Sequence, residues 1–308
     1  MRVGVSLGIS SRQQLRDFAA EVRELEEAGA GRIWLIDSQL AMKDVYVGLA
    51  LAALHTEQAW LGTGVTNPIT RHPSVTANAI LAIDELSGGR AVFGIGAGDS
   101  AVYAIGSKPA KVAELERALH FFREALPRIP IYVAVSQPRM CGLAGRLADG
   151  AIVMGPSQPD FVRQQVGWIQ DGLQTAARDR ASFDISLLVT LAESVDDVRA
   201  WATSEARLIA DFSELPAGLE PYRDEIAAAK AAYDFKEHLS VHAGHRAAIS
   251  DELARTLAVV GSAQECAGRL QDLLACGGDS LIFALPGSGR VERLRFITEE
   301  VLSKVAGE

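Results

Sequence analysis

Two aspartates stand at the ends of apolar runs, where their carboxylates could take part in acid–base or hydrogen-bonding chemistry. Asp37 closes the run RIWLID (32–37), and Asp99 follows the glycine-rich segment GIGAG (94–98). A carboxylate placed against a substrate can accept a hydrogen bond or exchange a proton, so both are candidate catalytic residues. Solvated loop aspartates are the ordinary alternative, and the elements that carry the two residues must decide between them.

Glycines and small polar residues end several of the apolar runs. A glycine lets a backbone N–H approach a ligand closely, and the start of a following helix favours a phosphate. We therefore expect a site for a flat ring and a phosphate rather than for a metal, although glycines that only allow close loop packing would give the same pattern. The candidate ligand-binding residues are Asp37, Gly64, Val65, Thr66, Gly96, Ala97, Gly98, Ser136, Gln137, Met154, Gly155 and Pro156.

Other catalytic patterns receive little support from the sequence. GIGAGD (94–99) fails the dinucleotide-binding fingerprint, which needs a glycine where Asp99 stands. His238, His242 and His245 share helical spacing, but no carboxylate falls between them as in a zinc hydrolase, so we expect a helix without metal. The sequence contains no nucleophile elbow, P-loop or cysteine–histidine pairing, which argues against hydrolysis and phosphoryl transfer.

The candidate residues lie on a regular alternation of apolar, β-branched runs and stretches of helical period. Such alternation is typical of parallel strands joined by crossover helices. Eight strand–helix units predict a closed (β/α)8 TIM barrel, with an open doubly wound sheet as the alternative. In a barrel the active site forms at the carboxyl ends of the strands, where the candidates stand. The eight runs span residues 2–9, 32–37, 59–65, 90–96, 129–135, 150–155, 184–192 and 279–287.

Residues 63–80, TGVTNPITRHPSVTANAI, combine a strand end, two proline breaks and the start of a helix. An ordinary connecting loop explains the breaks at Asn67-Pro68 and His72-Pro73. The Gly64-Val65 pair inside the strand instead favours a strand end shaped to hold a flat ligand, because a strand glycine often marks a bulge or a close approach. We expect His72 to cap the helix or hold the corner rather than to act in catalysis.

One connection is much longer than the rest. Between the runs at 184–192 and 279–287 lies an insertion of about residues 195–261, which we expect to fold mainly as helices over the barrel mouth. Such connections usually serve as lids or oligomer contacts, so a homodimer or higher homo-oligomer is also expected. No linker rich in proline, glycine and serine marks a second domain, and we expect residues 1–308 to form a single barrel domain.

The composition limits the partners and the compartment. A net charge of −9, a pI near 5.3 and the lack of a lysine- and arginine-rich run oppose nucleic-acid binding. No apolar run reaches the roughly 20 residues that span a bilayer. Cys141, Cys266 and Cys276 show no metal-ligand or redox spacing, which favours a reducing, cytoplasmic setting. We expect a small-molecule substrate and neither a nucleic-acid nor a membrane partner.

Residues 62–100, from GTGVTNP to GAGDS, resemble the signature region of the bacterial luciferase-like superfamily of flavin and deazaflavin oxidoreductases. The resemblance extends through RIWLID and GRLADGAIVMGPS (145–157) and is strongest to the branch of methylenetetrahydromethanopterin reductases, which use coenzyme F420. It implies a (β/α)8 barrel with a two-electron ring cofactor in its mouth and an insertion between strands 7 and 8. It also implies a strand-3 bulge against the ring, with a cis or bulged peptide at Gly64-Val65.

Two positions depart from the family pattern. Ser6 stands where the methanopterin reductases carry a glutamate, and Ser38 stands where sugar-phosphate dehydrogenases and luciferases carry a histidine. The resemblance implies an oxidoreductase that passes a hydride between F420 and a small organic electrophile or alcohol, with Asp37 and Asp99 positioning ring and substrate. The proton-handling group stays open. An FMN-dependent monooxygenase and a non-catalytic flavin-binding protein are the alternatives.

Overall fold

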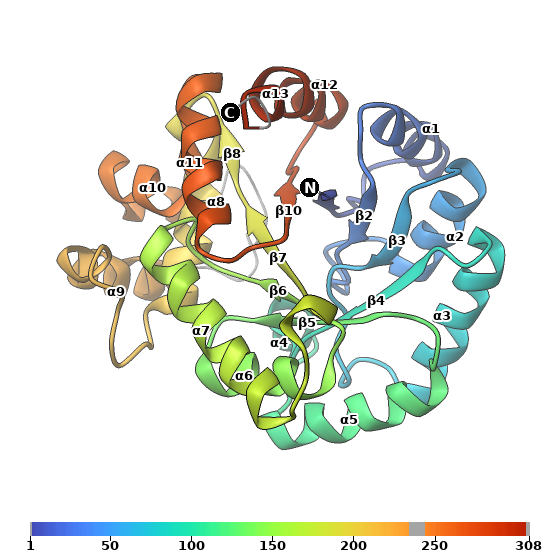
Figure 1. Cartoon of the computed structure of the whole chain (residues 1–308). Coiled ribbons are helices and arrows are strands. Elements are labelled where there is room, and N and C mark those ends of the chain that lie inside the picture. The colour runs from blue at the N-terminus through green and yellow to red at the C-terminus, as the bar shows by residue number, and fades with distance from the viewer. Residues whose placement is uncertain (1, 234–243, 306–308) are drawn as a thin grey trace.

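Eight parallel strands close into a barrel in the computed structural model, which describes residues 2–233 and 244–305 (Figure 1). Around the barrel the strands follow the order β1-β10-β7-β6-β5-β4-β3-β2. The predicted (β/α)8 barrel is confirmed, and each predicted run contains one barrel strand. The strands are β1 (Arg2–Leu7), β2 (Arg32–Leu35), β3 (Trp60–Thr63), β4 (Ala91–Ile95), β5 (Ile131–Val135), β6 (Gly150–Val153), β7 (Asp184–Val189) and β10 (Ser280–Ala284).

The continuous apolar runs supply two layers of core. Every residue of β2, β4 and β10 is buried, as expected for parallel strands covered on both faces. Trp34 of β2 packs edge-on against Tyr132 of β5 with ring centroids 5.3 Å apart. These strands lie on different sides of the barrel, so the two rings, with Val92, Ile152 and Ile282, fill its interior. The larger core lies between the strands and the surrounding helices.

Helices cover the outside of the barrel and alternate with the strands along the chain (Figure 1). Their order around the barrel follows the order of the strands, so short connections suffice nearly everywhere. The helices are α1 (Leu15–Glu27), α2 (Val45–His55), α3 (Pro73–Ser87), α4 (Ser100–Ala104), α5 (Val112–Ala125), α6 (Pro138–Leu147), α7 (Pro159–Thr175), α11 (Ala263–Ala275), α12 (Arg290–Arg295), a π-helical turn (Phe296–Val301) and α13 (Leu302–Val305).

Helix α3 shows how local sequence sets the ends of an element. His72 is its N-cap residue, and the ring Nδ1 accepts a hydrogen bond from the Ser74 backbone N–H at 3.3 Å. Pro73 occupies the first helical position, where its missing N–H costs no hydrogen bond. Gly88 ends the helix with φ +69°. The expectation that His72 caps this helix is confirmed.

The predicted seventh strand, 184–192, is two strands. β7 stays in the barrel, whereas β8 (Leu191–Ala192) leaves it and pairs in parallel with β9 (Val259–Val260). The Val259 N–H donates to the Thr190 carbonyl at 2.9 Å, at the point where the chain departs. Apolar residues run through both strands, so hydrophobicity alone could not mark the exit. The small β8-β9 sheet holds the two ends of the insertion side by side.

The described part of the insertion is mainly helical. It contains α8 (Val195–Ile209), the short helix η2 (Glu220–Tyr222), α9 (Arg223–Ala232), the short helix η4 (Gly244–Ala248) and α10 (Asp251–Leu257). Helices α9 and α10 project beside the barrel, and α8 packs against both (Figure 1). His238 and His242, two of the three spaced histidines, lie outside the described residues. Among the described helices, none is long and apolar enough to cross a membrane.

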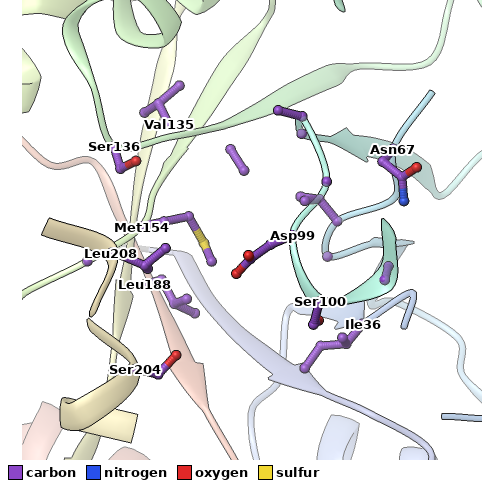
Figure 2. Close-up of a pocket in the computed structure, with 18 of the residues that line it drawn as sticks. Ile36, Asn67, Asp99, Ser100, Val135, Ser136, Met154, Leu188, Ser204 and Leu208 are labelled. Carbon is purple, nitrogen blue, oxygen red and sulfur yellow. The ribbon is translucent and has the colours of Figure 1, made fainter. Parts of the chain in front are cut away.

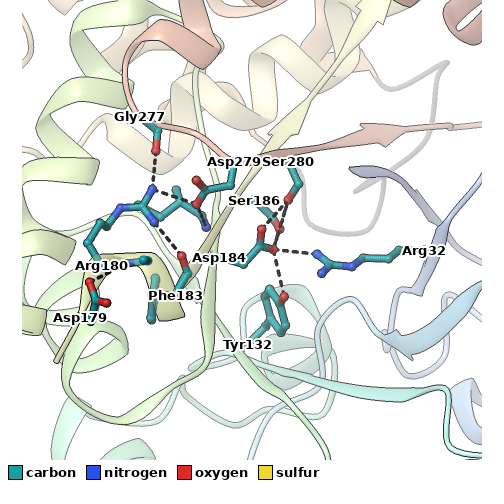
Figure 3. A network of polar contacts seen from close by, with 12 residues as sticks. Arg32, Tyr132, Asp179, Arg180, Phe183, Asp184, Ser186, Gly277, Asp279 and Ser280 are labelled. Atoms are coloured by element: carbon teal, nitrogen blue, oxygen red, sulfur yellow. Dashed lines mark hydrogen bonds and ion pairs between the residues drawn. The ribbon is translucent and has the colours of Figure 1, made fainter. Parts of the chain in front are cut away.

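A buried ionic network closes the amino-terminal end of the barrel (Figure 3). Asp184, the first residue of β7, accepts hydrogen bonds at Oδ2 from Arg32 Nη1 at 2.7 Å, Tyr132 Oη at 2.9 Å and Ser186 Oγ at 2.9 Å. Ser280 Oγ lies 3.2 Å from the same oxygen. The network therefore links β2, β5, β7 and β10 across the barrel.

The ion pair with Arg32 outweighs the effect of burial on the pKa of Asp184. Burial alone would raise the pKa of the Asp184 carboxyl, but the charge and hydrogen bond of Arg32, with the Ser186 and Tyr132 hydroxyls, lower the pKa below its usual 3.8. A lowered folded-state pKa contributes stability that is present above the unfolded-state pKa and is lost as the pH falls through the folded-state pKa. The stability that this network contributes should therefore be lost only in acid.

We expect Asp184→Asn to lower the free energy of unfolding at neutral pH by about 3 kcal/mol, because it leaves the buried Arg32 without its counter-charge. Urea unfolding measures the loss. The difference from wild type should shrink in acid, where the wild-type carboxylate becomes protonated. Asp171→Asn, at an exposed position of α7, is the matched control and should have little effect. Equal effects of the two replacements at neutral pH would contradict the role of the network.

Candidate active site

A cavity of about 270 Å³ opens at the carboxyl ends of the barrel strands and is bordered on one side by α8 (Figure 2). Its position agrees with the usual location of active sites in such barrels. Gln137 and Pro156 are not among its lining residues, and Gln137 is instead the N-cap residue of α6. The structure brings the other candidates to the cavity: Asp37, Gly64, Val65, Thr66, Gly96, Ala97, Gly98, Asp99, Ser136, Met154 and Gly155.

The end of β3 forms one wall of this cavity. The Gly64-Val65 peptide is cis, as the resemblance led us to expect. A side chain has no room at position 64, because a Cβ there would lie 2.6 Å from Cβ of Trp34. The Thr66 N–H then donates to the Gly94 carbonyl of β4 at 3.1 Å. Packing and hydrogen bonds thus fix this strand end, which an ordinary connecting loop would not require.

Asp37 supports the same cavity wall by hydrogen bonds to its side chains. Its side chain is buried, and Oδ2 accepts hydrogen bonds from Thr66 Oγ1 at 2.6 Å and Arg71 Nη1 at 2.9 Å. Oδ1 accepts one from Gln39 Nε2 at 2.6 Å. Arg71 also reaches Asp44, the N-cap residue of α2, at 2.7 Å. Every Asp37 oxygen is therefore occupied by a protein donor, an arrangement suited to holding the corner at 64–71.

Asp99 connects the barrel to the insertion. The residue lies in the loop after β4 and projects into the cavity (Figure 2). Its Oδ2 accepts a hydrogen bond from Arg207 Nη2 of α8 at 2.5 Å. The Arg207 guanidinium also lies 4.8 Å from the centre of the Tyr233 ring. This ion pair joins the two sides of the cavity mouth.

The geometry can be compared with known proteins. The sequence profile described as luciferase-like monooxygenase matches residues 1–280. The chain belongs to this family. A closed barrel with its cavity at the strand ends agrees with that assignment, and the resemblance inferred from residues 62–100 is confirmed.

Several characterised proteins of the family are similar over most of their length. A 5,10-methylenetetrahydromethanopterin reductase from Archaeoglobus fulgidus is 28% identical, over 92% of this chain and 94% of the relative. An F420-dependent glucose-6-phosphate dehydrogenase from Kineococcus radiotolerans is 25% identical, over 93% and 90%. The solved structure of the coenzyme F420-dependent tetrahydromethanopterin reductase from Methanopyrus kandleri has a TM-score of 0.77 and 21% identity, covering 98% of this chain and 99% of that chain. This likeness in structure shows the shared fold.

The two serines that depart from the family pattern lie at or beside the cavity. Ser6 of β1 lines it. Ser38 is buried, and its Oγ lies 3.3 Å from Oγ of Ser100 at the start of α4. Neither hydroxyl titrates near neutral pH. Neither position therefore supplies the acid or base that the resemblance implies for other branches of the family.

Helix α8 contributes lining residues that were not predicted from the sequence. Trp201, Ser204, Glu205 and Leu208 line the cavity from one face of this helix. Ser204 and Leu208 mark that face in Figure 2. Their spacing of three and four residues is a helical signal that the sequence contains. We expected helices over the mouth from the sequence, but the sequence could not show which side chains of α8 face the cavity, because this depends on tertiary packing.

Glu205 is a buried ionisable residue of the cavity. The residue is 5% exposed, and its Oε1 accepts a hydrogen bond from Thr190 Oγ1 at 3.2 Å. Burial raises the pKa of the Glu205 carboxyl well above its usual range, and the hydrogen bond from Thr190 opposes this only in part. Burial therefore favours the neutral, protonated form of this carboxyl. Within residues 2–233 and 244–305, no group of three histidine, cysteine or acidic side chains gathers as a metal site would need.

We expect Asp99 and Arg207 to be energetically coupled. In a double-mutant cycle, Asp99→Asn and Arg207→Gln should show a coupling of about 0.5–1 kcal/mol, kept small because the Asp99 side chain is 36% exposed to screening solvent. Urea unfolding of the four proteins measures it. The exposed pair Asp160 and Arg163 on α7, treated in the same way, should give a smaller value. Strict additivity at Asp99 and Arg207 would refute the coupling.

Proposed function

We propose that this chain is an oxidoreductase that passes a hydride between coenzyme F420 and a small organic substrate. The observation that carries the proposal is the cavity at the barrel mouth, walled by the backbone at residues 64–66 and 96–98. Relatives that cover nine-tenths of the chain include enzymes named as F420-dependent. A barrel mouth formed by glycine-rich strand ends is suited to a flat ring that needs close backbone contact.

The residues of the cavity fit a deazaflavin. Val65, Ala134, Met154 and Leu188 supply apolar surface for a ring, and the glycines between them leave the backbone accessible. Two buried polar atoms on the cavity face of α8, Trp201 Nε1 and Glu205 Oε2, have no hydrogen-bond partner among the described residues. Buried polar groups normally find a partner, so a ligand with polar atoms would complete the site.

The chain's own residues would hold and orient the reactants. The backbone at 64–66 and 96–98 would contact the ring, and the Ser136 hydroxyl would bind a polar group of the cofactor. Asp99 would position the substrate, and Asp37 would hold the wall behind the ring. The bound cofactor supplies the two-electron chemistry, while the protein supplies orientation and exclusion of water. Helix α8 covers the cavity and limits its contact with solvent.

An FMN-dependent monooxygenase is the second candidate, because the family takes its description from such enzymes. Both activities need a flat ring against the same wall. They differ in the fate of the reduced ring, which reacts with oxygen in a monooxygenase and passes a hydride to the organic substrate in our proposal. A flavin-binding protein without turnover is the non-enzymatic alternative.

We also propose a setting for this activity. Residues 1–308 would form one barrel domain that acts in the cytoplasm, where the three buried free cysteines would stay reduced. A homodimer or higher homo-oligomer is supported by exposed apolar side chains on the adjacent helices α2 and α3, since patches of this kind often mark interfaces. These side chains are Val47, Leu54, Val75, Leu81 and Leu86.

We expect the protein to bind oxidised F420 more tightly than FMN, because the relatives named above use F420. Fluorescence titration with each cofactor measures the two dissociation constants. Reduced F420 should then be oxidised when a carbonyl substrate is added, with little oxygen uptake. Oxygen consumption with reduced FMN would instead support the monooxygenase, and tight binding without turnover of any substrate would support the binding protein.

Gly64→Ala should weaken F420 binding by about tenfold or more, because the added Cβ would lie 2.6 Å from Cβ of Trp34 and force the cavity wall to move. Fluorescence titration of both proteins measures the change. Gly167→Ala in α7 is the matched control, since nothing lies within 4 Å of a Cβ at that position. Wild-type affinity in a folded Gly64→Ala protein would remove this wall from the proposed site.

A further inference from the structure

The cavity needs a group that can give a proton to the substrate, and most of its ionisable side chains are already engaged. Asp37 accepts hydrogen bonds from Arg71, and Asp99 accepts them from Arg207. Both carboxylates act as acceptors in these pairs. Glu205 is the remaining ionisable residue among the described residues that line the cavity.

Glu205 differs from Asp37 and Asp99 in its ion-pair and hydrogen-bond partners. It makes no ion pair among the described residues, and its Oε1 is occupied by the Thr190 hydroxyl. Its Oε2 is buried and has no partner in the described structure. In the neutral acid, Oε1 serves as the acceptor, so the proton belongs on Oε2. This leaves an O–H donor without an acceptor at the cavity wall.

A second unpartnered donor lies one helical turn away. Trp201 precedes Glu205 by four residues on α8, so the two side chains share a helix face, and both line the cavity. Trp201 Nε1 is also buried without a partner among the described residues, and an indole N–H can only donate. A ligand atom that accepts hydrogen bonds would give both donors a partner.

We propose that Glu205 Oε2 donates a proton to the substrate and that Trp201 Nε1 hydrogen-bonds to the same acceptor atom. The inference rests on the proposed function and specifies its substrate class, namely compounds with a C=O or C=N bond that become an alcohol or an amine. It also specifies the direction of hydride transfer, from the cofactor to the substrate. A carboxyl whose Oε1 accepts from Thr190 and whose buried Oε2 has no donor to stabilise a carboxylate favours reduction, because oxidation of an alcohol would need the carboxylate as base.

Hydride transfer and proton transfer together would reduce the substrate by two electrons. A hydride from the reduced deazaflavin adds to the carbon of the C=O or C=N bond, and the π electron pair moves to the oxygen or nitrogen. That atom forms a bond to the Glu205 proton, while the O–H bond of the acid breaks. The substrate gains two electrons, which the deazaflavin loses. Glu205 is left as a carboxylate and regains a proton from solvent, into which the oxidised deazaflavin releases its own.

The first test uses the full-length protein loaded with reduced F420 and three probes: acetone, cyclohexanone and pyrroline. Glu205→Gln keeps the size and neutrality of the side chain, so it should fold and bind F420 as wild type does. We expect kcat to fall about 100-fold with a small change in KM, because the amide has no transferable proton. Glu214→Gln, at an exposed position in the insertion, should match wild type. Wild-type kcat/KM should decline as rising pH ionises Glu205, and the variant should lose this dependence.

The second test does not depend on turnover. The infrared C=O stretch of a buried carboxylic acid should be present in wild type at neutral pH and absent from Glu205→Gln. Trp201→Phe should mainly raise KM, because it removes one hydrogen bond and leaves the acid. Undiminished reduction of a probe by Glu205→Gln, or no such band in wild type, would overturn this inference alone. A wild type that binds F420 but reduces none of the probes would also overturn this inference alone, whereas a wild type that binds no F420 would reject the proposed function and this inference with it.

Discussion

The cavity wall depends on one buried carboxylate at the end of β2. Asp37 accepts hydrogen bonds from Thr66 and Arg71, so the end of β3 and the corner that follows are tied to a neighbouring strand. A buried charge is costly unless it is paired and hydrogen-bonded, and Thr66 and Arg71 of this corner, together with Gln39, meet that need. The same contacts keep residues 64–66 at the edge of the cavity. The wall can thus be formed largely by backbone, with the supporting charge hidden behind it.

The barrel and the insertion contribute different chemistry to the site. Barrel strand ends supply glycines, small side chains and accessible backbone, which suit a ring. Helix α8 supplies Arg207 to pair with Asp99, the buried carboxyl of Glu205 and the indole of Trp201. Helix α8 belongs to the long connection and not to the eight strands of the barrel. This division is consistent with a family in which one fold serves several reactions.

The carboxyl groups of Asp184 and Glu205, at opposite ends of the barrel, have different surroundings. At the amino-terminal end, Asp184 is surrounded by donors from four strands and stays ionised with Arg32. At the carboxyl end, Glu205 has only the Thr190 hydroxyl as a partner, so burial favours its neutral form. A saturated ion pair stabilises the fold, whereas a partly satisfied acid leaves a proton available to a ligand. The charge of Arg32, together with the hydrogen bonds around Asp184, distinguishes the two carboxyl groups.

The sequence alone predicted the barrel, because eight apolar runs with helices between them leave few arrangements, although closure over an open doubly wound sheet was decided by the tertiary structure. It also located most of the cavity lining, since residues at strand ends in a barrel share one mouth. It could not separate the roles of Asp37 and Asp99, which depend on partners distant in the chain, Arg71 and Arg207. Nor could it reveal the role of Glu205, because its carboxyl is removed from water only when α8 packs beside the cavity, and this burial raises its pKa. Burial is a property of the assembled fold, and no local pattern records it.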